Sequence, residues 1–343
     1  MSALGAALLV SGLFITLGST DVEPAAGETP PIVTITRNPV VPRAIEVDAA
    51  DWVQMVTTET APAVARVRVE TETSSRVGSA VVIRGDGYLL TSYDLVRDAE
   101  QINVSLPGED SNHSASLLGT DKISGLAVIG VEDADFPTAV LGFLIPQPEV
   151  GAPAVALSGG AVPADLTMGA VSSDNATFPV ADDRNLHGLL ALGKPMPPGA
   201  SGGALIDQSG AVVGIVVDVG SRNTTFAVPI SYARQIAEDL MNYGDSRHPW
   251  MAIRGQDLDA QVAFDYGIDG GVLVTELVGN DGPAANAGLR LDDIIVGLEE
   301  TPLWSMTDLV LSLRKHTPGE TISITVLRGD TFIDIALTLG LRP

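Results

Sequence analysis

The chain has 343 residues, enough for two domains with separate cores, and its 36 glycines, 22 prolines and few aromatics favour short strands over long helices. The formal net charge of −24 repels phosphate backbones and anionic lipid headgroups, so we expect no nucleic-acid partner. Cysteine is absent, which excludes disulfides, thiol nucleophiles and cysteine–zinc sites.

The first predicted element is an apolar segment at the N-terminus. Residues 2–20 carry no charge, and this length is near the lower limit for crossing a bilayer. No basic residues precede the segment and no small-x-small cleavage site is evident, as a secretory signal would have. We therefore predict a single-pass membrane anchor over 1–20, with a cleaved signal or a buried helix as alternatives. The folded domains are expected outside the cytoplasm, or secreted if the segment is cleaved.

The proline-rich residues 21–47 have no sustained periodicity and are predicted to be a linker. Residues 48–244 are predicted as the first domain, beginning with a short helix capped by Asp48. Short apolar or alternating runs bounded by turn residues then predict strands. These strands are 64–69, 79–83, 88–90, 102–106, 126–131, 154–157, 204–206 and 212–217. Their spacing indicates a sandwich or a barrel, and Gly-Asp-Gly at 85–87 and Gln-Ser-Gly at 208–210 predict hairpin turns.

A helix is predicted over 231–243, because apolar residues recur there on one helical face. Ser231 is its expected cap and Gly244 ends it. Residues 245–249 are predicted to be a hinge. The second domain, 249–341, has the order strand, strand, short helix, strand, helix, strand, strand, which is typical of a small α+β module.

The stretch Gly-Ala-Ser-Gly-Gly-Ala-Leu at 199–205 carries the clearest chemical signal. Glycines on both sides of Ser201 allow a tight turn in which two backbone amides point at one spot beside the hydroxyl, as in an oxyanion hole. A glycine-rich hairpin between strands is the alternative interpretation of this string.

Around this motif the chain resembles the HtrA family of trypsin-like proteases over about residues 50–340. The matching segments, in the order of the family, are 61–67, 78–83, 85–91, 119–121, 126–129, 167–172 and 226–229. The resemblance implies a mainly β fold, with a chymotrypsin/trypsin-like double β-barrel followed by a PDZ domain. It also implies that Ser201 stands at the position of the nucleophile and that the amides of Gly199 and Ser201 form the oxyanion hole.

The other two catalytic positions of the family depart from its pattern. Asp94 stands where the family has its histidine base, in Thr-Ser-Tyr-Asp at 91–94, and Gly125 stands at the position of its aspartate. Ala200 replaces a residue that is commonly asparagine. A serine hydroxyl needs a base to remove its proton, and a carboxylate with an ordinary pKa of about 3.9 is a weak base at neutral pH. Lys194 could in principle form a serine–lysine dyad, but solvent exposure is the expectation for it.

The four histidines, at 113, 187, 248 and 316, are predicted to lie on the surface. His113 falls in a polar turn, His187 in a charged loop, His248 in the hinge and His316 near the last helix. No pair has the spacing of metal ligands on a helix, so we predict neither a metal nor a cofactor.

The C-terminal domain resembles the PDZ domain of the HtrA arrangement in its segments 270–277, 282–289 and 291–295. A PDZ domain binds a peptide C-terminus beside an edge strand, with backbone amides holding the carboxylate. By the resemblance, the carboxylate loop consists of Trp250, Met251, Ala252 and Ile253, and Leu309 and Leu313 contact the terminal side chain of the peptide. The family usually has glycine at the position of Ala252. A PDZ domain that only packs against the barrel is the alternative.

Three functions follow from this pattern. The first is a pseudoprotease or adaptor in envelope protein quality control, which binds unfolded proteins or C-terminal peptides without cleaving them. The second is an active serine endopeptidase with a non-standard base. The third is an oligomeric scaffold, with a homotrimer as the assembly that the resemblance implies.

Overall fold

The computed structural model describes residues 49–343 except 110, 143–146, 161–164, 181–183, 197–198, 219–222 and 280. The predicted anchor 1–20, the linker 21–47 and Asp48 lie outside the described residues. Within the described part of the chain, no helix is both long enough and apolar enough to cross a membrane.

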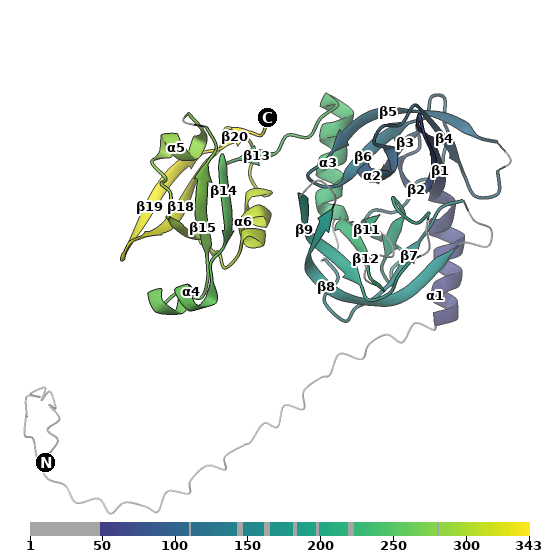
Figure 1. Cartoon of the computed structure of the whole chain (residues 1–343). Helices are drawn as coiled ribbons and strands as arrows, with labels where there is room; N and C mark the ends of the chain where they lie inside the picture. Colours follow the sequence, from purple (N-terminus) through teal and green to yellow (C-terminus); the bar gives the residue numbers. More distant parts are fainter. Residues whose placement is uncertain are drawn as a thin grey trace, which may run out of the picture. The chain divides into compact units, whose positions relative to one another are not determined.

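The first closed barrel has the strand order β1-β2-β3-β6-β5-β4 (Figure 1). Its strands are β1 (Val64–Glu70), β2 (Ser75–Arg84), β3 (Tyr88–Ser92), β4 (Gln101–Ser105), β5 (His113–Asp121) and β6 (Leu126–Gly130). In β1, buried and exposed side chains alternate, as a strand with one face toward the core requires. In β6, the first four side chains are all buried, because this strand has the barrel interior on one face and a helix against the other.

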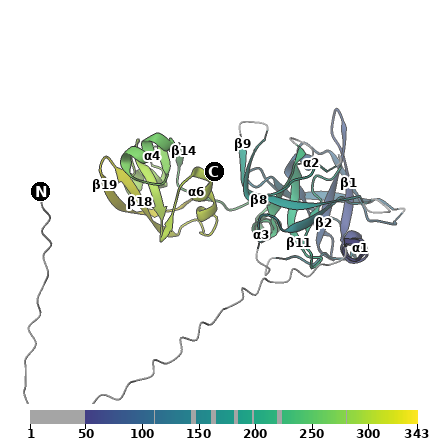
Figure 2. The same ribbon diagram turned by 90° about the horizontal axis from the view of Figure 1, so that it is seen from below.

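The second closed barrel has the order β10-β11-β12-β9-β8-β7. Its strands are β7 (Pro153–Leu157), β8 (Leu166–Val180), β9 (Arg184–Leu192), β10 (Ala204–Ile206), β11 (Val212–Asp218) and β12 (Thr225–Pro229). Strands β8 and β9 form a long hairpin with three register shifts, which extends from the barrel in Figure 2. Such bulges bend a long hairpin so that one part of it can close the barrel.

Two longer helices flank the barrels. Helix α1 (Ala49–Met55) is held by the buried Trp52, whose indole Nε1 donates to the Asp207 carbonyl at 3.0 Å. Helix α3 (Ile230–Tyr243) packs against β5 and β6 of the first barrel and β11 of the second (Figure 1). Gly244 ends α3 in a left-handed conformation, as predicted. The short helix α2 (Tyr93–Val96) follows β3 directly.

The C-terminal domain is a sheet with the order β14-β15-β16-β18-β19, with helices packed beside it. Its elements are β13 (Pro249–Trp250), β14 (Ile253–Asp257), α4 (Ala260–Tyr266), β15 (Val272–Leu277), α5 (Pro283–Ala287), β16 (Ile294–Leu298), β17 (Thr301–Pro302), α6 (Met306–Leu313), β18 (Thr321–Arg328), β19 (Thr331–Thr338) and β20 (Gly340–Leu341). Strand β13 pairs with β20, so the two ends of this domain are joined.

The predicted fold class is confirmed, and each predicted strand of the first domain is found. Strands β5, β8, β9 and β12 were not predicted, and neither were α2 and α4. Ser231 is wrong as the cap of α3: the helix begins one residue earlier, after Pro229, whose φ of −54° suits a helix start. His187 lies within β9 and His113 begins β5, so the loop and the turn predicted for them are wrong.

Candidate functional site

Ser201 lies in the glycine-rich loop that leads into β10, and this loop is tied to β2. The Ser79 amide donates to the Ser201 carbonyl at 2.8 Å, and the Ser79 hydroxyl donates to the Gly199 carbonyl at 2.7 Å. Thr91 of β3 donates its hydroxyl to the Ser79 carbonyl at 2.6 Å. The serine loop therefore lies next to the end of β3. Thr91, in this part of β3, precedes Asp94 by three residues.

Two glycines of this loop cannot be replaced without strain. Gly199 has a φ of +98° and Gly202 a φ of +85°, a conformation that side-chain-bearing residues rarely adopt. A β-carbon at position 202 would also lie 2.0 Å from the Ser79 carbonyl oxygen. The backbone of this loop therefore requires glycine at positions 199 and 202. Such a tight turn is what the predicted oxyanion hole beside the Ser201 hydroxyl needs.

Asp94 lies in the first turn of α2, and its carboxylate belongs to an ion pair. Its Oδ1 is 3.6 Å from Nε of Arg97, one helical turn later. Arg76 donates to the Asp94 backbone carbonyl at 2.7 Å from Nη1. Both arginines therefore hold the turn that carries Asp94, Arg97 through the carboxylate and Arg76 through the backbone carbonyl.

Gly125 lies beside this turn, because the Tyr93 amide donates to the Gly125 carbonyl at 2.8 Å. The structure thus brings together the positions of Asp94 and Gly125, although 31 residues separate them in the sequence. Gly125 has a φ of +76°. A β-carbon there would be 3.0 Å from Leu186 Cδ1 and 3.7 Å from Val217 Cγ1. Side chains of the second barrel therefore fill the space into which a residue at position 125 would point.

None of the four histidines is hydrogen-bonded to Ser201 within the described residues. Their side-chain partners include Glu109 for His113, Thr177 for His187, Asp121 for His248 and Glu320 for His316. The predicted surface position is wrong for His248, which is 8% exposed. Lys194 is exposed, and its backbone carbonyl accepts the Thr225 hydroxyl.

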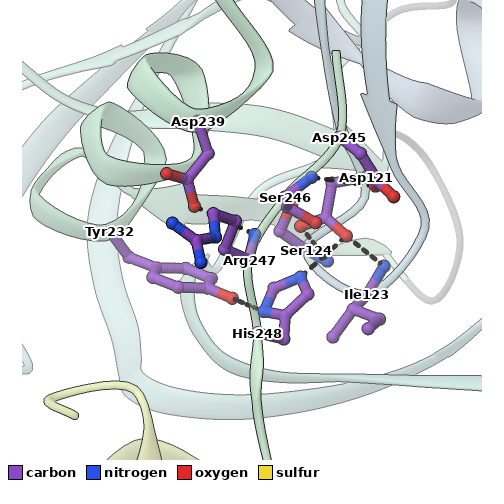
Figure 3. A network of polar contacts seen from close by, with 9 residues as sticks. All are labelled: Asp121, Ile123, Ser124, Tyr232, Asp239, Asp245, Ser246, Arg247 and His248. Carbon is purple, nitrogen blue, oxygen red and sulfur yellow. Dashed lines mark hydrogen bonds and ion pairs between the residues drawn. The ribbon is translucent and has the colours of Figure 1, made fainter. Parts of the chain in front are cut away.

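His248 and Asp121 form a buried pair that sequence reasoning missed (Figure 3). Nε2 of His248 lies 2.9 Å from Oδ1 of Asp121, and Nδ1 lies 3.4 Å from the Tyr232 hydroxyl. Amides of Ile123 and Ser124 donate to the same carboxylate. The pair joins the end of β5 to the segment that follows α3, so it fixes the start of the C-terminal domain rather than the serine loop.

The pKa of Asp121 reflects this setting. Burial by itself would raise the pKa of this carboxyl group. The hydrogen bond and charge of His248, with the hydrogen bonds from Ser124 and Ile123, outweigh burial, and the pKa lies below its ordinary value of 3.8. Asp121 is therefore held as a carboxylate.

The predicted peptide-binding residues of the C-terminal domain come together around one groove of about 190 Å³. The groove lies between the start of β14 and helix α6. Its lining includes all of the predicted residues, Trp250, Met251, Ala252, Ile253, Leu309 and Leu313. Ser305 caps α6, its side chain accepting from the Asp308 amide.

Ala252 has a φ of +64° and is 1% exposed. This left-handed conformation is the one for which the family uses glycine. The Ala252 carbonyl accepts from the Val278 amide at 2.8 Å, and the Met251 carbonyl accepts from the Ala284 amide at 2.9 Å. The loop therefore keeps a glycine-like backbone despite the added methyl group.

In the described part of the chain, no group of three or more acidic or histidine side chains could hold a metal ion.

Comparison with known proteins agrees with this architecture. The model of the trypsin-like peptidase domain matches residues 78–215, and that of the PDZ domain matches residues 249–339. A probable periplasmic serine endoprotease, DegP-like, of Pseudomonas fluorescens is 30% identical over 275 residues, covering 78% of this chain and 56% of that protein. The DegP-like protein of Halomonas elongata is 29% identical over 273 residues, covering 77% of this chain and 56% of that protein. The chain thus spans about half the length of these curated relatives.

Among solved structures, the HtrA-type protease AlgW with a tripeptide is 28% identical to this chain, with a TM-score of 0.71. The match covers 85% of this chain and 97% of AlgW. AlgW with a decapeptide matches with 25% identity and a TM-score of 0.68, covering 85% of this chain and 99% of that one.

Proposed function

Since the chain is an HtrA-type protein, a trypsin-like peptidase domain followed by a PDZ domain, we propose that it is an extracytoplasmic pseudoprotease that binds peptides and unfolded proteins without cleaving them. In this proposal Ser201 keeps the position of the nucleophile, while Asp94 and Gly125 occupy the positions of the family's histidine and aspartate. We also propose that the chain acts as an adaptor in protein quality control of the cell envelope.

The observation that carries this proposal is the packing around Gly125. In a serine triad the aspartate orients the histidine, and the histidine removes the proton of the serine. Here Leu186 and Val217 lie where a side chain at position 125 would point, and the backbone there is left-handed. This apolar packing around position 125 supports the proposal that the chain works without the triad aspartate.

The ion pair at Asp94 supports the same proposal. A base must accept the serine proton and later give it to the leaving amine. The Asp94 carboxylate is engaged in an ion pair with Arg97, with 3.6 Å between Oδ1 of Asp94 and Nε of Arg97. Loss of the base in a serine triad lowers turnover on the order of 10⁶-fold, so turnover by this chain is expected to be negligible.

Peptide binding is supported by two features. The glycine loop around Ser201 keeps its tight backbone, and the groove beside α6 is lined by the residues predicted for a PDZ ligand. AlgW, a structural neighbour, was solved with a tripeptide. We therefore propose the serine cleft and the PDZ groove as the two binding surfaces.

The location and the domain limits are part of the same proposal. Relatives described as periplasmic support a place outside the cytoplasm. We propose that residues 1–20 anchor the chain, 21–47 form a linker, 48–244 form the peptidase-like domain and 249–341 the PDZ domain. The proposed homotrimer can be tested by light scattering on the purified chain.

Casein digestion tests the loss of activity. We expect the chain to release no more peptide from casein than its Ser201→Ala variant, with trypsin as the positive control. Cleavage that the Ser201→Ala substitution abolishes would show instead an active endopeptidase with a non-standard base.

A further inference from the structure

Strand β1 presents two arginines on the outer face of the first barrel. Arg66 and Arg68 are exposed, whereas the residues that alternate with them along the strand are buried. Side chains at positions i and i+2 of a strand point to the same face, about 7 Å apart. The two arginines therefore stand next to each other on one surface.

Neither guanidinium group has a partner within the part of the chain that the structure describes. No ion pair or side-chain hydrogen bond of Arg66 or Arg68 occurs there, although acidic residues outnumber basic ones by 43 to 19 in the chain. Glu70, the next residue on this face, is half-buried and accepts the Ser75 hydroxyl at 3.0 Å. The two guanidinium groups can therefore pair with carboxylates of another molecule.

These arginines adjoin the serine loop. Arg66 lies directly opposite Ser79 of β2, and opposite residues of antiparallel strands share a face. The Ser79 hydroxyl accepts from the Gly159 amide at 2.8 Å and donates to the Gly199 carbonyl at 2.7 Å. The turn at Gly160 packs on Arg66, because a β-carbon at position 160 would lie 2.3 Å from the Arg66 Cβ. The arginine face of β1 therefore begins one strand away from the serine loop.

The residues opposite the two arginines on the neighbouring strands are neutral. Arg68 lies opposite Val77 of β2, which is 36% exposed, and opposite Asn103 of β4. Ser105 of β4 lies opposite Arg66. Alternate side chains of an extended peptide also stand about 7 Å apart, so acidic residues at alternate positions match the spacing of the arginines. This surface therefore suits an extended acidic segment of polypeptide.

We propose that Arg66 and Arg68 bind an Asp- or Glu-rich stretch of an unfolded polypeptide whose adjoining residues occupy the serine cleft. This inference rests on the proposed peptide-binding function and names the class of polypeptide bound. A polypeptide is favoured over an anionic membrane because the arginines adjoin the serine loop. The net charge of −24 repels an acidic peptide, so a preference for one requires a local cationic surface of this kind.

The test uses the purified chain and two labelled dodecapeptides, read by fluorescence polarisation. Both peptides are C-terminal amides with the same leucines, and they carry either glutamate or glutamine at alternate positions. We expect the glutamate peptide to bind about tenfold more tightly at low salt, and this advantage to shrink at high salt because ions screen exposed charges. Arg66→Gln and Arg68→Gln should each weaken binding of the glutamate peptide about threefold, and the double variant about tenfold. Binding of the glutamine peptide should not change.

Arg84→Gln is the matched control, because Arg84 is an exposed arginine of the same barrel that is paired with Asp86. It makes the same change of charge and should bind both peptides as the unmodified chain does. Equal affinities for the two peptides, or equal losses in Arg84→Gln and Arg66→Gln, would overturn this inference alone. Binding to vesicles of anionic lipid that the double variant abolishes, without a preference between the peptides, would assign the arginines to a membrane instead. Failure of both peptides to bind would overturn the proposed function of the serine cleft itself.

Discussion

The corner around Gly125 and the groove beside α6 differ in what occupies them. At Gly125, atoms of Leu186 and Val217 lie 3.0 and 3.7 Å from where a β-carbon would stand. Beside α6, a groove of about 190 Å³ stays open, with apolar walls and two arginines. The difference teaches that packing between the two barrels closes one of these places, while the other keeps room for a ligand.

The largest effect should come from forcing an acid back into the filled corner. Gly125→Asp combines a left-handed φ with a carboxylate pressed against Leu186, and we expect a loss of about 4 kcal/mol in the free energy of unfolding. Urea denaturation measures this. Gly151→Asp is the matched control, because Gly151 also has a positive φ but no atom within 4 Å of its added β-carbon. Equal losses for the two variants would contradict the packing argument.

The Asp121–His248 pair holds the segment between α3 and the C-terminal domain against the end of β5. Asp121→Asn leaves a buried histidine without its anion, and we expect a loss of about 3 kcal/mol in the free energy of unfolding near pH 7. Tyr232→Phe, which removes the hydroxyl that lies 3.4 Å from Nδ1 of His248 but leaves the Asp121–His248 contact, should cost far less. A small effect of Asp121→Asn would show that the pair is not needed to hold the segment after α3.

The same pair predicts a pH dependence. The pKa of Asp121 is lower in the folded chain than its ordinary value of 3.8, so the unfolded chain binds the proton more readily. The stabilisation is therefore complete above the ordinary pKa and is lost as the pH falls through 3.8 and below. As the pH is lowered from 7 to 2, the melting temperature should fall less steeply for Asp121→Asn than for the unmodified chain. Parallel curves would contradict this cause.

A charge placed in the open groove should act on binding rather than on the barrels. Leu313→Asp puts a carboxylate where the last side chain of a peptide lies, and we expect affinity to fall about 30-fold, or about 2 kcal/mol. Leu291→Asp is the control, because Leu291 is 57% exposed and does not line the groove. Equal affinities for the two variants would show that the peptide binds at another place on the chain.

The smallest effect concerns Ala252. Ala252→Gly relieves a left-handed alanine, and we expect the PDZ domain to gain about 1 kcal/mol of stability, seen as a higher urea midpoint. A lower midpoint would show that the buried methyl group packs well enough to outweigh the strain.

The sequence was sufficient for the architecture, while the assignment of Asp94 and Gly125 to triad positions stays a prediction. Turn residues at 85–87 and 208–210 lie between paired strands as predicted, and Thr91 leads directly to Asp94. Strands β8 and β9 escaped prediction because β8 has only two buried side chains among its 15 residues and so lacks the apolar alternation of a strand. Its backbone pairing with β9 holds it in place. Helix α4 escaped because it is short and leaves Phe264 79% exposed, so it has no apolar periodicity.

The site details that were missed all depend on contacts between distant residues. His248 and Asp121 are 127 positions apart, and no local pattern marks their hydrogen bond. Leu186 reaches Gly125 from the other barrel, and Arg314 enters the groove only because α6 ends there. Motif order can align a position with the pattern of a family, but only the structure shows which side chains pack around that position.

The most direct test of the account is covalent labelling of Ser201 with a fluorophosphonate probe. The purified chain, its Ser201→Ala variant and trypsin are incubated with the probe, and modification is measured by intact mass. We predict that trypsin is labelled completely while the chain stays at the level of the Ser201→Ala variant, because no base activates the hydroxyl. Rapid, complete labelling of the chain that is lost in Ser201→Ala would contradict the pseudoprotease.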